Sequence, residues 1–320
     1  MPKIIIHDTV DPSALALLNA REDMEIVTVA RDERERLRRE LADADSIILR
    51  YLPLDSGDLR AAKKLKVVAR HGVGYDNVDM AAAEELGIPV ACIGDANSVT
   101  VAELALYFML ACAKQGLAND AIVRGGDWLA REEASTMELF EKTVLVVGFG
   151  RIGSLVAPRC AAFGMNVSVC DPYFPQERIN RAGFTPVADF ATELAEADIV
   201  TLHTPLNDET RHMIDAAALA RMKEGALLIN TSRGPVVDGA ALAEALAAGR
   251  LYAAGMDVFE DEPPTLADPL LGLANTVFTP HIGGLSRECF RRSAIVCAQN
   301  SLDAIDGKLD ASYVVNPEVM

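Results

Sequence analysis

Short apolar runs alternate along the chain with longer segments in which apolar residues recur at helical spacing. The runs predict strands at residues 4–7, 25–29, 46–49, 65–69, 88–90, 144–147, 166–170, 198–202, 226–229, 253–257 and 276–279. Helices are expected between them, among others at residues 12–18, 31–41, 240–248 and 286–305. Strands that alternate with helices form parallel sheets joined by right-handed crossovers. The pattern therefore predicts an α/β protein with two doubly wound parallel sheets.

One expected helix, residues 99–114, is apolar on all sides and follows the potential capping residues Asn97 and Ser98. A helix without a polar face is normally buried, so we expect it between domains or between subunits. The only tryptophan, Trp128, follows in a loop and is expected to pack against protein rather than to bind a ligand. Pro158 is expected to kink the helix in which it lies, because it removes one backbone hydrogen bond.

Residues 144–171 have the order strand, glycine loop, helix, strand and acid. Gly148 permits a tight turn, Gly150 lets a pyrophosphate approach the backbone, and Gly153 lets the helix lie close to the strand. Asp171 ends the second strand, where a carboxylate can accept hydrogen bonds from both ribose hydroxyls and repel the 2′-phosphate of NADP. The alternative is a glycine-rich turn without a ligand. The flanking strands and the acid favour an NAD site.

Three residues with suitable chemistry, Arg233, Glu262 and His281, each follow a predicted strand in the second half of the chain. An arginine can clamp a carboxylate through two parallel hydrogen bonds. A histidine can give a proton to a carbonyl or take one from an alcohol, and a nearby carboxylate stabilises its protonated form. These groups are the ones that reduction of a 2-keto acid with NADH requires. His203 also ends a strand, and a plain hydrogen-bonding role suits it equally well.

In the first half, Arg50 and Arg70 end predicted strands, and Gly72 and Gly74 follow the second of these. Glycines after a parallel strand expose amides at its carboxyl end, where open sheets bind ligands. Surface solubility explains the two arginines equally well, whereas the glycines favour anion binding at Val73 and Gly74.

The formal net charge of −17 disfavours nucleic acid and anionic membranes as partners, although an anionic substrate responds to the local field. No apolar run reaches transmembrane length, and the chain begins with a strand-like segment rather than a signal peptide. The six cysteines form no CxxC pair and no metal-binding spacing, so we expect no bound metal. Reduced thiols in a cytoplasmic chain are the simplest interpretation.

Seven motifs together resemble the D-isomer-specific 2-hydroxyacid dehydrogenase family, nearly from end to end. They are residues 71–79 (HGVGYDNVD), 97–103 (NSVTVAE), 147–153 (VGFGRIG), 202–206 (LHTPL), 230–234 (NTSRG), 256–263 (MDVFEDEP) and 279–284 (TPHIGG). The resemblance implies that Arg233 binds the substrate carboxylate and that Glu262 orients and charges His281, the acid/base. It also implies substrate contacts from Arg50, Val73 and Gly74. The positions implied for NAD binding are Thr100, Gly148, Gly150, Arg151, Ile152, Gly153, Asp171, His203, Thr204, Pro205, Thr210, Thr231, Ser232, Asp257, His281 and Gly283.

The resemblance further implies two Rossmann-like domains, with the nucleotide domain inserted into the substrate domain. The substrate domain would comprise residues 1–98 and 291–320, the NAD-binding domain residues 99–290, and the assembly would be a homodimer. One position departs from the family pattern, because Glu141 stands before Lys142 where the family usually has glycine.

The leading hypothesis is an NAD-dependent dehydrogenase of D-2-hydroxy acids that is similar to phosphoglycerate dehydrogenase. A hydroxypyruvate or glyoxylate reductase is the alternative within the same class. Formate dehydrogenase fits less well, because hydride transfer from formate requires no proton transfer. Corepressors that resemble this family would bind NAD without turnover, but the set of Arg233, Glu262 and His281 favours an enzyme. The chain ends soon after its last helix, so we expect no additional C-terminal regulatory domain.

Overall fold

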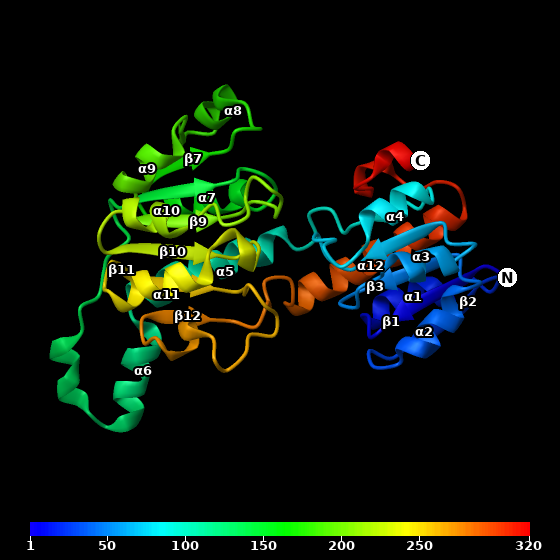
Figure 1. Ribbon diagram of the computed structural model, residues 1–320, viewed down its shortest axis with the longest axis horizontal. Coiled ribbons are helices and arrows are strands. Elements are labelled where there is room, and N and C mark those ends of the chain that lie inside the picture. Colours follow the sequence, from blue (N-terminus) through cyan, green and yellow to red (C-terminus); the bar gives the residue numbers. More distant parts are fainter. The chain divides into compact units, whose positions relative to one another are not determined.

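The computed structural model describes residues 1–320, and the chain forms two compact units (Figure 1). Met1–Asn97 and Gly284–Met320 make the terminal unit, and Ser98–Gly283 makes the central unit. The expected second boundary at residue 290 differs from the observed one. Helix α12 (Arg287–Ile305) lies wholly in the terminal unit, because it packs there against α1 (Pro12–Asn19), β3 (Ser46–Leu49) and β4 (Val67–Arg70). Residues 284–290 therefore belong to that unit.

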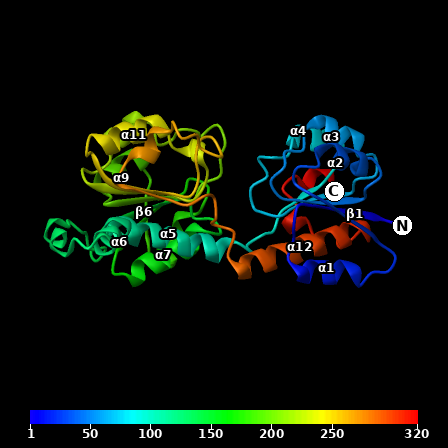
Figure 2. The same cartoon turned by 90° about the horizontal axis from the view of Figure 1, so that it is seen from below.

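The terminal unit contains a sheet of five parallel strands in the order β2-β1-β3-β4-β5. The strands are β1 (Lys3–His7), β2 (Glu25–Val29), β3 (Ser46–Leu49), β4 (Val67–Arg70) and β5 (Val90–Ala91). Ile4 and Ile6 of β1 pack on the face covered by α1 and α12, and Ile5 packs on the face covered by α2, α3 and α4 (Figure 2). The bounds of these helices are α1 (Pro12–Asn19), α2 (Arg34–Leu41), α3 (Ser56–Ala61) and α4 (Met80–Glu85). A strand buried on both faces carries consecutive apolar residues, as β1 does at Ile4, Ile5 and Ile6.

The central unit contains seven parallel strands in the order β12-β11-β10-β9-β6-β7-β8. The strands are β6 (Thr143–Val147), β7 (Asn166–Cys170), β8 (Thr185–Pro186), β9 (Ile199–Leu202), β10 (Ala226–Asn230), β11 (Leu251–Met256) and β12 (Thr276–Phe278). Strand β6 comes first in the chain but lies between β9 and β7, so the chain order reverses at this point. Open parallel sheets bind ligands in the crevice above such a reversal. The two parallel sheets confirm the predicted fold class.

Helices cover both faces of the central sheet (Figure 2). Helices α5 and α7 lie on one face, and α9, α10 and α11 contribute to the hydrophobic cluster on the other. Their bounds are α5 (Ser98–Ala113), α7 (Gly153–Ala162), α9 (Phe190–Glu196), α10 (Ala216–Arg221) and α11 (Gly239–Ala247), while α8 (Gln176–Arg181) leads to the edge strand β8. Pro158 lies inside α7, which continues on both sides of it.

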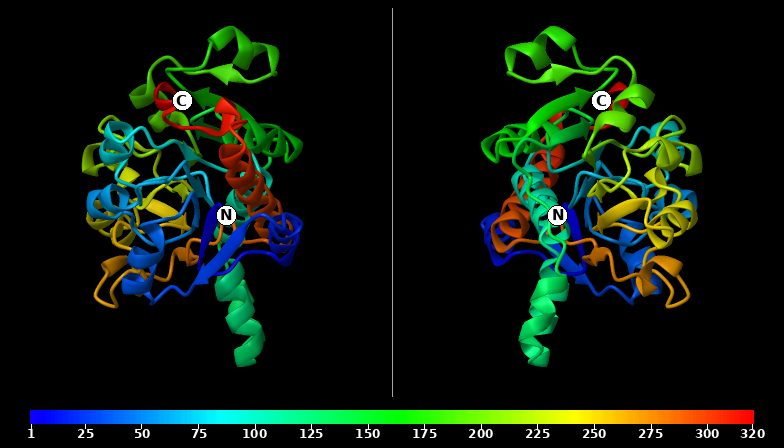
Figure 3. Two further views of the ribbon diagram at one scale, coloured as in Figure 1. Left: turned by 90° about the vertical axis from the view of Figure 1, so that its right-hand side faces the viewer. Right: turned by 90° about the vertical axis from the view of Figure 1, so that its left-hand side faces the viewer.

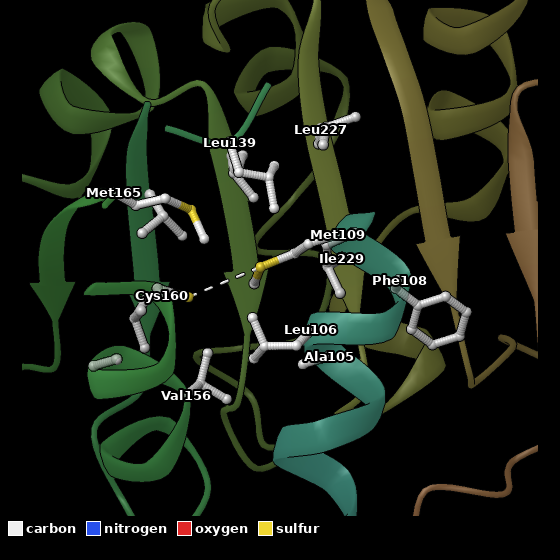
Figure 4. Packing of buried hydrophobic residues seen from close by; sticks show 14 of the residues in the cluster. Ala105, Leu106, Phe108, Met109, Leu139, Val156, Cys160, Met165, Leu227 and Ile229 are labelled. Carbon is white, nitrogen blue, oxygen red and sulfur yellow. Dashed lines mark hydrogen bonds between the residues drawn. The ribbon is translucent and has the colours of Figure 1, made fainter. Parts of the chain in front are cut away.

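The apolar helix α5 is buried against the sheet of its own unit. Phe108 and Met109 are fully buried, and Met109 lies beside Ile229 of β10 (Figure 4). Phe108 packs on Gly255 of β11, where an added Cβ atom would lie 2.6 Å from the phenylalanine side chain. The Cys160 thiol of α7 lies 3.9 Å from the Met109 sulfur, which joins the two helices on this face. Burial of α5 therefore comes from packing within one unit and needs neither a domain boundary nor a second subunit.

Beyond α5, the chain leaves the central sheet and forms a projecting arm of α6 (Gly116–Gly125) and a short 3-10 helix (Trp128–Glu133) (Figures 1 and 3). The packing role expected for Trp128 is wrong within one chain, because its side chain is 58% exposed. The Trp128 ring makes one cation–π contact, with the guanidinium of Arg131 at 5.3 Å, and it stacks on no other aromatic ring. No single helix has the length and composition to span a membrane, and α5 with α6 passes that test only as a pair bent by 57°.

Glu141, the residue that replaces the usual glycine, adopts a left-handed backbone conformation with φ of 61°. Its carbonyl accepts a hydrogen bond from the Asn166 side chain at 3.1 Å, and its amide donates to the Gly164 carbonyl. These bonds keep the turn into β6 in a conformation that costs a side-chain-bearing residue roughly 1–2 kcal/mol. The backbone here retains the conformation that a glycine adopts easily.

Candidate active site

The glycine loop lies at the carboxyl end of β6, where the strand order reverses. Gly148 has φ of 90°, and its amide donates to the Cys170 carbonyl of β7. A Cβ atom on Gly153 would lie 1.9 Å from the Gly148 carbonyl oxygen, so helix α7 can begin this close to the strand only with glycine there. The loop geometry therefore depends on both glycines, as the motif predicts.

The Asp171 carboxylate closes this loop from the end of β7. Its Oδ2 accepts from the Phe149 amide at 2.7 Å, and its Oδ1 accepts from the Tyr173 amide at 2.9 Å. Asp171 therefore fixes the glycine loop in addition to its predicted place beside a ribose. The sequence pattern did not indicate this second role.

The residues around the loop fit a dinucleotide. A Cβ atom on Gly150 would meet nothing within 4 Å, so its backbone faces open space at the start of α7, beside Arg151 and Ile152. The loop after β9, the neighbouring strand, carries Thr204, whose buried hydroxyl has no hydrogen-bond partner in the protein. A free hydroxyl and open amides beside a helix N-terminus are suited to phosphate and ribose groups.

His203 sits at the end of β9 and behaves as a neutral hydrogen-bonding residue. Burial lowers its pKa to about 3. Its Nε2 lies 3.0 Å from the Thr201 hydroxyl, and its Nδ1 lies 3.5 Å from the Thr231 hydroxyl. An imidazole that stays neutral throughout the physiological range is a poor proton donor, so His203 is not the acid of this site.

Two further loops shape the same edge of the sheet. The Thr210 hydroxyl donates to the Pro205 carbonyl at 2.6 Å and closes the turn after β9. Ser232 donates through its hydroxyl to Asn230 Oδ1 at 2.8 Å, and the Asn230 amide group donates to the Arg233 carbonyl at 2.9 Å. Asn230 is buried and thus holds the backbone of Arg233, a function that was not assigned from the sequence.

Asp257 follows β11 and organises the loop that carries His281. Its Oδ1 accepts from the Thr279 hydroxyl at 2.5 Å and from the Ile282 amide at 2.8 Å, and its Oδ2 accepts from the Gly283 amide at 2.8 Å. Burial raises the pKa of Asp257, and these three donors oppose that shift. The carboxylate that was expected to contact NAD is therefore already occupied by protein donors.

His281 and Glu262 form a hydrogen-bonded pair. His281 Nδ1 lies 2.7 Å from Glu262 Oε2, while Glu262 Oε1 accepts from the Phe259 amide at 3.1 Å. The His281 backbone is left-handed, with φ of 53°, and its amide donates to the Asp257 carbonyl. Burial raises the pKa of Glu262, but the hydrogen bond and charge of His281, the Phe259 amide and the charge of Arg233 outweigh it and lower the pKa overall. Glu262 is thus a carboxylate at neutral pH.

Arg233 lies in the loop after β10, between the strands that lead to His203 and to Glu262. Its Nη1 donates to the Ser232 carbonyl at 2.7 Å, and its charge acts on Glu262. Arg233, Glu262 and His281 thus follow three adjacent strands, β10, β11 and β12. The arrangement offers a cation for an anionic group and a carboxylate–imidazole pair for proton transfer.

Elsewhere in the central unit, Thr100 lies in the first turn of α5.

The terminal unit has its own polar edge, formed where β1, β3 and β4 end. Arg50 is 8% exposed, and its guanidinium lies between the rings of Tyr51 and Phe290, at 4.7 and 4.9 Å. Its Nη1 donates to the carbonyl and hydroxyl of Thr9, each at 3.1 Å. The partner Phe290 was not expected, because only the fold brings α12 to β3.

His71 follows β4 next to this arginine. Its ring packs on Phe290 with centroids 5.2 Å apart, and its Nε2 is buried without a hydrogen-bond partner. Burial and the charge of Arg50 lower the pKa of His71 to about 4. Val73 and Gly74 continue the same loop, so this edge carries a neutral imidazole and a cation close to the predicted anion-binding amides. Across the whole chain, no group of three or more residues is arranged to hold a metal ion.

Comparison with known proteins gives a consistent result. Residues 106–283 match the model of the D-isomer specific 2-hydroxyacid dehydrogenase NAD-binding domain. The chain is 38% identical to the D-3-phosphoglycerate dehydrogenase of Methanocaldococcus jannaschii, over 100% of this chain and 60% of that protein. It is 39% identical to the hydroxypyruvate reductase of Thermotoga maritima, over 92% of this chain and 95% of that protein.

A solved structure with a bound cofactor also resembles the chain. The NAD-dependent formate dehydrogenase from Staphylococcus aureus in complex with NAD superimposes with a TM-score of 0.87 and 28% identity, over 98% of each chain. The chain spans about three fifths of the length of the phosphoglycerate dehydrogenase that it matches. It spans nearly all of the hydroxypyruvate reductase. The chain therefore belongs to the D-isomer specific 2-hydroxyacid dehydrogenase family.

Proposed function

We propose that this protein is an NAD-dependent dehydrogenase that interconverts D-2-hydroxy acids and 2-keto acids. The observation that carries the proposal is the His281–Glu262 pair, 2.7 Å across, which follows strands adjacent to that of Arg233 in a unit with a dinucleotide loop. A proton donor, an anion clamp and a nucleotide site are the three parts that reduction of a 2-keto acid requires.

Each side chain has one task in this proposal. Arg233 binds the substrate carboxylate. In the terminal unit, the loop of Val73 and Gly74 is the segment proposed to offer amides to an anion. His281 gives its proton to the carbonyl oxygen in reduction and takes the hydroxyl proton in oxidation. Glu262 accepts from Nδ1, which leaves Nε2 to face the substrate and stabilises the charged ring. Bound NADH supplies the hydride.

The proposed substrate class is that of phosphoglycerate dehydrogenases. Arg50 and Arg70 lie at the ends of adjacent strands of the terminal sheet, with Asp8 Oδ2 3.5 Å from Arg50 Nη1. Two cations beside one carboxylate suit a substrate with a second anionic group such as a phosphate. Hydroxypyruvate and glyoxylate are the alternative substrates, because the chain is also 39% identical to a hydroxypyruvate reductase. NADH oxidation measured with phosphohydroxypyruvate, hydroxypyruvate and glyoxylate decides between them. Binding of NADH without turnover of any keto acid would contradict the proposal.

We also propose that the protein is cytoplasmic. All six cysteines are free thiols, and all but Cys170 are buried. Proteins of oxidising compartments use cysteines mainly in disulfides, which this arrangement lacks. Cell fractionation that recovered the protein outside the cytoplasm would contradict the assignment.

A homodimer is the assembly we propose, formed through the projecting arm. Leu117, Val123, Trp128 and Leu129 are each at least 57% exposed on this arm. Exposed apolar side chains gathered on one segment mark an interaction surface. Light scattering at micromolar concentration should give twice the chain mass of 34.3 kDa, and Trp128→Ala with Leu129→Ala should shift the equilibrium toward monomer. A wild-type protein that remains monomeric overturns the assignment.

Cofactor choice should favour NADH over NADPH, because the Asp171 carboxylate repels a 2′-phosphate. Asp171→Ala should lower the ratio of kcat/KM with NADH to kcat/KM with NADPH by at least about tenfold (about 1.4 kcal/mol). It should also weaken NADH binding, since the Phe149 amide loses its acceptor. Asp171→Asn is the matched control, because it removes the charge and retains an acceptor oxygen. Equal use of NADPH by the wild type would show that the residue does not discriminate.

Arg233→Ala should reduce kcat/KM for the keto acid and leave NADH binding almost unchanged. A lost contact between a charged donor and a desolvated carboxylate costs roughly 2–4 kcal/mol. Arg221→Ala, on the exposed side of α10, is the control and should be neutral. If Arg233→Ala lowers kcat/KM for the keto acid by less than about tenfold, Arg233 does not bind the substrate carboxylate as proposed.

His281→Ala should lower kcat by about 10²–10⁴, the usual range for a positioned acid/base, with NADH affinity retained. Reduction needs the protonated His281 ring, so the rate of reduction should fall as pH rises. Oxidation needs the neutral ring, so the rate of oxidation should rise with pH. Glu262 is ionised because its pKa is lowered, and its charge favours the imidazolium. Glu262→Gln should therefore move the reduction limb to lower pH. A folded His281→Ala protein with near-normal kcat would end the assignment.

A further inference from the structure

A second carboxylate–imidazole pair lies on the loop that carries Glu262. His212 Nε2 is 2.7 Å from Glu260 Oε1, and Glu260 stands two residues before Glu262. His212 belongs to the turn after β9 and has a left-handed backbone, with φ of 50°. Glu260 Oε2 also lies 3.4 Å from the Gly239 amide, at the start of α11. The pair therefore joins three loops at the carboxyl edge of the central sheet.

The turn of His212 is bonded to the segment that follows Arg233. The His212 amide donates to the Pro235 carbonyl at 2.8 Å, and the Ile214 amide donates to the Val236 carbonyl at 3.2 Å. The Asp238 amide returns a bond to the Ile214 carbonyl at 3.0 Å. Because these bonds run along the backbone, a shift of His212 carries the segment beside Arg233 with it.

The Arg233 loop is also seated directly on the loop of Glu260. A Cβ atom on Gly234 would lie 1.8 Å from the Phe259 carbonyl oxygen and 2.5 Å from the Glu260 amide nitrogen. Only glycine permits this approach of the two backbones. The other end of the Glu260 loop is held by Glu262, whose carboxylate accepts from the Phe259 amide and pairs with His281.

The segment 259–262 thus has two anchors, His212 through Glu260 and His281 through Glu262. We propose that His212 and Glu260 are positioning residues, which fix Arg233 relative to the Glu262–His281 pair. This inference rests on the proposed dehydrogenase function and adds two residues to it. Neither touches the reacting atoms; they act through Arg233 and Glu262. The glycine loop and Asp171 belong to β6 and β7, so NADH binding should not depend on them.

The test compares Glu260→Ala, His212→Asn and the double variant in the full-length protein. Asparagine tolerates the left-handed backbone at residue 212 but is too short to reach Glu260. Each single variant should reduce kcat/KM for the keto acid by roughly 5–30-fold, through both KM and kcat, because small displacements of reacting groups are costly. The double variant should be no worse than the more impaired single one, since both remove the same contact. NADH affinity should remain within about twofold.

Two controls separate positioning from a general loss of structure. Glu260→Gln retains an acceptor for His212, so it should have most of the wild-type activity that Glu260→Ala loses. Its rate of reduction should depend on pH as in the wild type, whereas in Glu262→Gln that dependence should shift to lower pH. Glu224→Ala, an exposed acid on the same unit, should be neutral. The melting temperature should fall by no more than about 2–4 °C, as expected for an exposed pair.

Two results would overturn the inference. Unchanged kcat/KM in both single variants would show that the pair positions nothing. An equal loss of NADH affinity would show a general structural effect. A wild-type protein that reduces no 2-keto acid would instead overturn the proposed function and this inference with it, so the two failures are distinguishable.

Discussion

The buried Asp257 carboxylate is the contact on which the proposed acid/base site depends. It is 2% exposed, and it binds the Thr279 hydroxyl and the amides of Ile282 and Gly283. These bonds fix the loop in which His281 adopts a left-handed backbone, and that conformation places its ring against Glu262. A buried carboxylate is stable only when donors compensate its desolvation, so the loop and Asp257 require each other.

The sheet order explains why residues distant in sequence share one edge. Strands β9, β6 and β7 bring the loop of His203, the glycine loop and Asp171 side by side, and β10, β11 and β12 do the same for Arg233, Glu262 and His281. Parallel strands all end at the same edge, so each βα connection can add one functional group there. The negative charge of the whole chain is compatible with the proposed anion binding, because a cation such as Arg233 acts at short range.

Local patterns were sufficient to predict much of this arrangement. Short apolar runs predicted the strands except the two-residue edge strand β8, which has no apolar run. The glycine spacing with Asp171 predicted the nucleotide loop, because a strand–turn–helix unit is encoded within about thirty residues. Helix α3 was missed although its capping box, Asp55 with Asp58, is a local signal. The helix expected from residue 31 begins at Arg34, because helix boundaries are weakly encoded.

Other features have no local signal. His212 meets Glu260 from 48 residues away, and Arg50 lies on Phe290 from the opposite end of the chain. The left-handed backbone of Glu141 contradicts residue preference and is maintained by its neighbours. Trp128 was assigned to packing because tryptophan is usually buried, yet the arm exposes it. Such contacts follow from the fold as a whole and appear only in three dimensions.

In the proposed reaction, the hydride goes to the carbonyl carbon of a 2-keto acid and the proton goes separately to its oxygen. The most direct measurement is the fate of deuterium when the protein reduces its preferred keto acid with NADH deuterated at the nicotinamide C4. We expect a D-2-hydroxy acid that carries deuterium on C2 when one of the two faces of the nicotinamide is labelled. An L product, or a product without deuterium at C2 from either labelled face of the nicotinamide, would contradict it.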